Sequence, residues 1–153
     1  MMKKLEELNT KYNIEAYYEC GDGWYDIIEP LIKYISEYNT VHDSKIDIVQ
    51  IKSKYAGLRF YVDGATPELD EMISQAEDKS YLTCEICGDV GKTRGGGWYE
   101  TLCDKHYEER ERRKYKQTFD YIMSKPDAVE VFQDIMWSKQ EQLDKLLDRL
   151  KNS

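Results

Sequence analysis

A chain of 153 residues, 41% hydrophobic and 34% charged, has the composition of a folded globular protein, which excludes an intrinsically disordered one. The net charge of −8 repels a phosphate backbone and argues against general binding to duplex DNA. No stretch reaches the roughly 18 apolar residues of a membrane span, and the N-terminal residues lack the apolar segment of a signal peptide. We therefore expect no membrane association and a cytoplasmic location.

The first eighty residues predict a small antiparallel sheet with flanking helices. We expect a short charged helix over residues 2–12 and a strand over 14–19. Alternating apolar residues and a short link predict an antiparallel hairpin of strands over 45–53 and 57–62. Thr66 then caps a helix whose first position is a proline.

One further helix lies between the first strand and the hairpin. Its apolar residues repeat at helical spacing from Ile27 to Ile35. Asp22 is placed to cap it, and Pro30 indicates either a kink or a helix that starts near Glu29.

The C-terminal third predicts two helices. Residues 104–118 carry dense alternating charge, which is typical of a solvated helix. The last helix starts near Ser124 and carries an amphipathic stripe that includes Leu143 and Leu147. This stripe packs on the domain or pairs with a second copy as a short coiled coil.

The fold class is therefore α+β with a zinc ribbon and C-terminal helices, divided into three parts. We expect an α+β domain over residues 1–80, the ribbon and its following helix over 81–117, and an amphipathic helix over 118–153.

Four residues between the domain and the C-terminal helices have the spacing of zinc ligands. Cys84 and Cys87 form one Cys-x-x-Cys pair, and Cys103 and His106 follow after fifteen intervening residues. In the reducing cytoplasm, clustered cysteines favour a metal over disulfides. Four protein ligands close a tetrahedral site, so we expect one structural zinc ion and no open position for catalysis.

The loop between the two ligand pairs is rich in features that suit a bound nucleotide. Lys92 and Arg94 are positively charged, three consecutive glycines permit close approach, and Trp98 and Tyr99 offer stacking faces. The alternative is a flexible ribbon turn with one packed tryptophan. Basic residues near the hairpin and a second Gly-Trp turn extend the candidate site. The predicted ligand-binding residues are Trp24, Lys52, Arg59, Arg94 and Trp98.

Residues 20–106 resemble a family of small zinc-ribbon proteins that is common in tailed bacteriophages and prophages. The resemblance rests on the Gly21–Trp24 turn, the segment 52–62, the two ligand pairs and the Gly95–Trp98 loop. It implies a phage accessory or anti-defence role in the host cytoplasm, and it implies no particular reaction.

Three functions follow as hypotheses. The first is a non-enzymatic binding protein that sequesters a nucleotide-like small anion. The second is a protein-interaction module that inhibits or recruits a host protein through the acidic first half and the last helix, with a possible homodimer through that helix. The third is an enzyme that uses carboxylates such as Asp22 and Asp26, for which the sequence gives little support.

Overall fold

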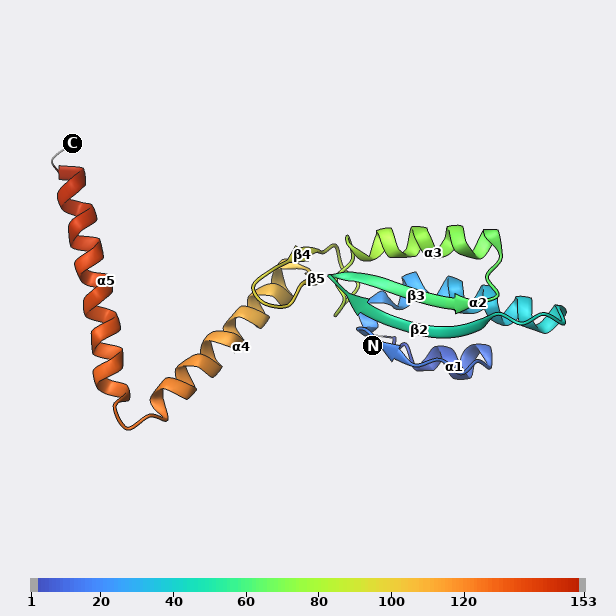
Figure 1. Cartoon of the computed structure of the whole chain (residues 1–153), viewed down its shortest axis with the longest axis horizontal. Coiled ribbons are helices and arrows are strands. Elements are labelled where there is room, and N and C mark those ends of the chain that lie inside the picture. Colours follow the sequence, from blue (N-terminus) through green and yellow to red (C-terminus); the bar gives the residue numbers. More distant parts are fainter. Residues whose placement is uncertain (1–2, 152–153) are drawn as a thin grey trace. The chain divides into compact units, whose positions relative to one another are not determined.

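The computed structural model divides the chain into two compact units, which run up to Glu108 and from Glu109 onward. It describes the backbone of residues 3–151, and the side chains of the same range except 131, 132, 143 and 146–151. The first unit holds both the predicted 1–80 domain and the metal-ligand segment. Its helices and small sheets confirm the α+β fold class (Figure 1).

The larger sheet has three strands in the order β1-β2-β3. Strands β2 (Asp47–Lys54) and β3 (Gly57–Asp63) form the predicted antiparallel hairpin, which is confirmed. Strand β1 (Tyr18–Glu19) pairs with β2 in parallel, so the sheet is mixed rather than purely antiparallel. The strand expected over residues 14–19 is therefore only two residues long.

The hairpin turn consists of Tyr55 and Ala56, which adopt φ angles of 53° and 68°. Two consecutive positive φ values are the signature of a type I′ turn, whose twist matches that of the flanking strands. The turn presents Tyr55 to solvent and keeps Ala56 buried.

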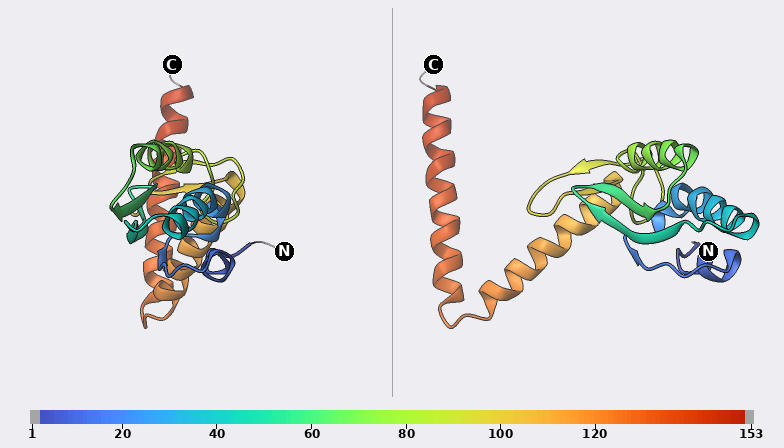
Figure 2. Two further views of the ribbon diagram at one scale, coloured as in Figure 1. Left: turned by 90° about the vertical axis from the view of Figure 1, so that its right-hand side faces the viewer. Right: turned by 45° about the vertical axis from the view of Figure 1, so that its right-hand side comes forward.

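Three helices pack around this sheet (Figures 1 and 2): α1 (Glu7–Tyr12), α2 (Tyr25–Val41) and α3 (Pro67–Ser80). The predicted start of α3 is confirmed, because the Thr66 hydroxyl accepts a hydrogen bond from the Leu69 N–H at 3.1 Å. Helix α2 begins at Tyr25 and contains Pro30, so the alternative start near Glu29 is wrong.

Asp22 does not cap α2, contrary to the prediction. It begins a single 3₁₀ turn (Asp22–Trp24) whose end leads into the helix, and its carboxylate accepts a hydrogen bond from the Leu5 N–H at 2.9 Å. The extra turn moves Asp22 away from the first free amides of α2. Its role is to fasten the N-terminal segment to the domain.

In the described part of the first unit, a hydrophobic core lies between the helices and one face of the sheet. Its fully buried members come mainly from α1, the 3₁₀ turn, α2, α3 and the hairpin, and they include Leu8, Trp24, Ile28, Ile32, Ile35, Ile51, Leu58 and Leu69. On β3 the core residues Leu58, Phe60 and Val62 occupy alternate positions, as expected for a sheet with one buried face. On β2 a bulge interrupts this alternation, so the core residues Ile48 and Ile51 are three positions apart.

A second, two-stranded sheet follows, made of β4 (Lys92–Arg94) and β5 (Glu100–Leu102) in antiparallel pairing. Helix α4 (Asp104–Met123) begins in the first unit, and α5 (Ala128–Lys151) lies in the second. Among the described side chains after Glu108, only Ala128 is buried. None of the described helices has the length and apolarity to cross a membrane.

Candidate metal centre

The four residues that the sequence singles out converge on one point. The sulfur atoms of Cys84, Cys87 and Cys103 and a ring nitrogen of His106 all lie within 4.8 Å of one another. His106 Nδ1 is 3.4 Å from Cys84 Sγ and 3.3 Å from Cys103 Sγ, and the sulfurs of Cys87 and Cys103 are 3.9 Å apart. This cluster could hold a metal ion.

The first ligand pair sits on a tight turn. Gly88 adopts a φ of 82°, and its N–H donates to the Cys84 oxygen at 2.9 Å. The Cys84 N–H in turn donates to the Asp89 oxygen at 2.7 Å. These two bonds fold the chain back on itself, so that both thiols point to the same side.

The second ligand pair is positioned by a strand and a helix. Strand β5 ends at Leu102, Cys103 follows, and His106 lies in the first turn of α4. The Tyr107 N–H donates to the Cys103 oxygen at 3.0 Å, which closes that first turn. The three-residue spacing places both side chains on one face of the helix start.

Main-chain amides favour an ionised sulfur in the centre of the cluster. Burial raises the pKa of the Cys84 thiol, but the N–H groups of Cys103, Cys87 and Ile86 outweigh it and lower this pKa to about 7. Cys84 is fully buried. A thiolate held in this way is the form that a metal ion binds.

The first ligand pair docks on the Gly21–Trp24 turn of the α+β domain. The Gly23 N–H donates to the Glu85 main-chain oxygen at 2.9 Å, and the Gly21 N–H donates to the Glu85 carboxylate at 3.1 Å. The other carboxylate oxygen of Glu85 accepts from the Ser53 hydroxyl at 2.9 Å. The ligand turn, the helix start and the sheet are thus joined through one residue.

Glycine is required at both positions of this contact. A Cβ on Gly21 would lie 2.2 Å from the Glu85 oxygen, and one on Gly23 would lie 2.3 Å from the Cys84 oxygen. Both atoms belong to the main chain and cannot rotate away. The Gly-Asp-Gly-Trp motif is therefore the platform on which the metal-ligand turn rests.

The structure distributes the predicted ligand-binding residues over separate places. Trp24 is fully buried in the core, and its indole N–H donates to the Thr83 oxygen at 2.9 Å. Lys52 and Arg59 are cross-strand neighbours on β2 and β3. The Arg59 guanidinium donates to the Tyr81 hydroxyl at 2.9 Å, which ties it to the end of α3.

Arg94 makes its contacts within the ribbon, the segment from Cys84 to His106 that contains β4 and β5. Its guanidinium forms an ion pair with Asp104, donates to the Leu102 oxygen at 3.3 Å, and lies 4.5 Å from the centre of the Tyr107 ring. These contacts fasten β4 to the start of α4, next to the metal ligands. They explain Arg94 as a structural residue of the ribbon.

Trp98 is 71% exposed and lines a hollow of about 360 Å³. The other lining residues are Lys54 and Tyr55 from the hairpin tip and Gly97 and Tyr99 from the ribbon loop. None of them comes from the Gly21–Trp24 turn, so the two Gly-Trp turns do not line one pocket. Sequence reasoning named Trp98 but missed Tyr55, whose only signal was an aromatic residue at the tip of a predicted hairpin.

Comparison with protein-family models, with curated proteins and with solved structures gives no match.

Proposed function

We propose that the cluster of three cysteines and one histidine binds a single zinc ion and that this zinc is structural. A tetrahedral site with Zn–S near 2.3 Å and Zn–N near 2.0–2.1 Å has S···S and S···N separations of about 3.8 and 3.6 Å. The sulfur–sulfur distance of 3.9 Å and the sulfur–nitrogen distances of 3.3 and 3.4 Å support this geometry. Four protein ligands leave zinc no open position for a reacting water.

We further propose that the protein is a non-enzymatic binding protein and that its ligand is a nucleotide-like small anion. The observation that carries this proposal is the hollow between two turn tips, where Tyr55, Trp98 and Tyr99 gather. All three rings are more than half exposed. Exposed aromatic faces stack on the planar ring of a base, with roughly 1–3 kcal/mol for each base.

The charge around the hollow supports an anion. The Lys54 ammonium lies 5.2 Å from the centre of the Tyr55 ring, at the edge of the hollow, and its lining contains no carboxylate. One lysine suits a single phosphate and is too little for a nucleic-acid backbone, which agrees with the net charge of −8.

A nucleotide-like ligand would explain how a protein that resembles phage accessory proteins could act. A phage accessory protein in the host cytoplasm would act against host defence by sequestering a signalling nucleotide. In this proposal, zinc holds the ribbon so that Trp98 and Tyr99 face the hairpin tip, and the protein binds without turning over its ligand.

Calorimetric titration with adenosine monophosphate, ribose 5-phosphate and inorganic phosphate tests the proposal. We expect binding of the nucleotide, loss of that binding in Trp98→Ala, and unchanged zinc content in this variant. Trp137→Ala is the matched control, because Trp137 is 75% exposed and lies outside the first unit. Equal affinity for the nucleotide in Trp98→Ala and in the unmodified protein would sink the assignment.

A protein-interaction module that inhibits or recruits a host protein is the second candidate, and one observation favours it. Large hydrophobic side chains on α4 and α5 are exposed in the described part of the second unit, among them Tyr115, Phe119, Tyr121, Met123, Val129, Ile135, Met136 and Trp137. A homodimer through α5 would cover part of them. The predicted stripe residues Leu143 and Leu147 lie outside the described side chains.

A further inference from the structure

Strand β1 leaves half of the β2 edge without a neighbour. Tyr18 and Glu19 pair with Ile51 and Lys52, and the remaining residues of β2 on the N-terminal side, Asp47–Gln50, have no strand beside them on the edge away from β3. In an antiparallel pair, alternate residues direct their main-chain groups away from the partner strand. This edge therefore offers donors and acceptors for which the described residues contain no strand partner.

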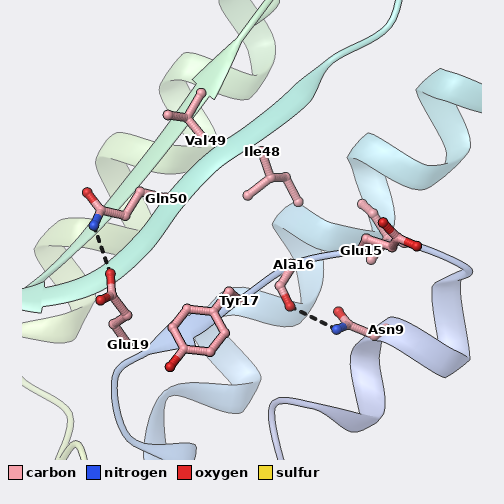
Figure 3. A pocket seen from close by; sticks show the side chains of 9 residues that line it. Asn9, Glu15, Ala16, Tyr17, Glu19, Ile48, Val49 and Gln50 are labelled. Carbon is pink, nitrogen blue, oxygen red and sulfur yellow. Dashed lines mark hydrogen bonds between the residues drawn. The ribbon is translucent and has the colours of Figure 1, made fainter.

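The segment that precedes β1 runs past this edge without joining it (Figure 3). The Ala16 oxygen accepts a hydrogen bond from the side chain of Asn9 in α1 at 2.8 Å, so this carbonyl bonds to α1 and not to β2. A bulge in the β2–β3 ladder between Ile48 and Gln50 shifts the register of β2 within the part of the strand that has no neighbour on this edge. The two segments separate, and a cleft of about 590 Å³ opens between them.

The cleft has an apolar floor and an exposed rim. Ile14, Ala16 and Ile48 line it and also pack against the hydrophobic core, so the floor is continuous with the core. At the rim, Tyr17 is 79% exposed and Val49 is 66% exposed. Both exposed side chains are large and apolar, and both lie where a bound chain would cover them.

The charged side chains that line the cleft are acidic, and the nearby Lys52 ammonium is bonded to the Gln50 side-chain oxygen at 2.7 Å. Glu15 and Glu19 line it, together with the amides of Asn9 and Gln50, and no lysine, arginine or histidine does so. The Gln50 amide donates to the Glu19 carboxylate at 2.7 Å and holds that carboxylate at the wall (Figure 3). The surrounding residues 1–80 carry 9 basic and 16 acidic side chains, which adds a long-range field of the same sign.

We propose that this cleft binds an extended segment of a partner protein in which lysine or arginine alternates with aliphatic residues. The segment lies along Asp47–Gln50 in the place that a longer β1 would take, and its main chain bonds to the open edge of β2. Its aliphatic side chains face the floor around Ile48, and its cationic side chains face Glu15 and Glu19. This site is separate from the aromatic hollow, and the proposal does not depend on the ligand of that hollow.

Backbone amide NMR of the zinc-loaded full chain tests the proposal with a capped hexapeptide of alternating lysine and valine as the probe. We expect shifts confined to residues 14–19 and 47–52. A second peptide of the same sequence, methylated on alternate main-chain nitrogens along one edge, keeps the charge but cannot donate those bonds, and we expect it to bind far more weakly. Equal binding of the two peptides, or shifts spread over the acidic surface, would overturn strand addition.

The double substitution Glu15→Gln and Glu19→Gln tests whether these two carboxylates select a cationic segment. We expect affinity for the lysine–valine peptide to fall about tenfold, because two exposed ion pairs are lost. The control double substitution is Asp43→Asn with Asp78→Asn, which makes the same change in net charge at exposed positions outside the cleft. An equal loss in both variants would show general charge attraction and would contradict a role for Glu15 and Glu19.

Discussion

The indole N–H of Trp24 donates to the main-chain oxygen of Thr83, next to the first metal ligand, at 2.9 Å. Trp24 is fully buried in the domain core, so this bond joins the core directly to the ribbon. Together with the Gly23–Glu85 contact, it joins the candidate metal centre to the domain. The stability of the core and the occupancy of the metal site should therefore change together.

Trp24→Phe tests this link. The substitution keeps an aromatic ring in the core but leaves the buried Thr83 oxygen without its donor and leaves a small cavity. We expect the free energy of unfolding to fall by about 1–3 kcal/mol in urea denaturation of the zinc-loaded protein. Trp137→Phe, at a position that is 75% exposed, should stay within about 0.5 kcal/mol. An equally small effect at Trp24 would contradict the link.

Metal removal should unfold more than the ribbon. In Cys84→Ser we expect zinc content to fall well below one ion per chain, because the substituted ligand is the fully buried one. Hydrogen exchange should then accelerate in the ribbon and at the start of α2. Cys20→Ser is the control, since Cys20 lies outside the cluster and its loss should leave zinc content unchanged. If hydrogen exchange at the start of α2 stayed at the rate of the unmodified protein in Cys84→Ser, loss of the metal would unfold the metal-ligand segment alone, which would contradict this prediction.

Gly23→Ala should be severe. Its Cβ would lie 2.3 Å from the Cys84 oxygen and 2.7 Å from the Cys87 nitrogen, so the metal-ligand turn would have to move. We expect a loss of about 3 kcal/mol or more in stability and a weaker hold on zinc, measured by denaturation and competition with a chelator. Gly95→Ala is the matched control substitution, because its Cβ would meet only the Tyr99 ring, at 3.6 Å. We expect it to lower the free energy of unfolding by about 0.5 kcal/mol or less.

Cys20 should be unreactive at neutral pH. Burial raises the pKa of its thiol to about 12, and the nearby Glu85 and Asp22 carboxylates act in the same direction. At pH 8, about one molecule in ten thousand then carries the thiolate, and a disulfide reagent should label Cys20 very slowly in the zinc-loaded protein. The rate should keep rising about tenfold per pH unit to beyond pH 10. A plateau near pH 9 would contradict this burial.

The same pKa has a consequence for stability. A raised pKa means that the folded state favours the neutral thiol, so this contribution is fully present below the unfolded pKa near 9 and is lost as the pH rises toward 12. In Cys20→Ser, the alkaline decline in the free energy of unfolding should be shallower. An identical slope in both proteins would assign the decline to other groups.

The sequence by itself determined the elements whose signals are local. The ligand quartet is confirmed as a cluster because a Cys-x-x-Cys turn and a three-residue helical spacing each fix two side chains without help from the rest of the chain. Thr66 caps α3 for the same reason: a hydroxyl and an amide three residues apart need only the helix start. The hairpin of β2 and β3 follows from its alternation and its short link.

Only the tertiary structure decided which surfaces meet. The motif around Trp24 has the sequence of a ligand-binding turn, yet the docking of Glu85 against Gly21 and Gly23 makes it a structural platform. The hollow beside Trp98 needs Tyr55, which is more than forty residues away along the chain. The gap beside β2 depends on where β1 stops, which the Asn9–Ala16 bond and the bulge in β2 determine. Such contacts join residues far apart in sequence, and no local pattern records them because their free energy arises only after the core has assembled.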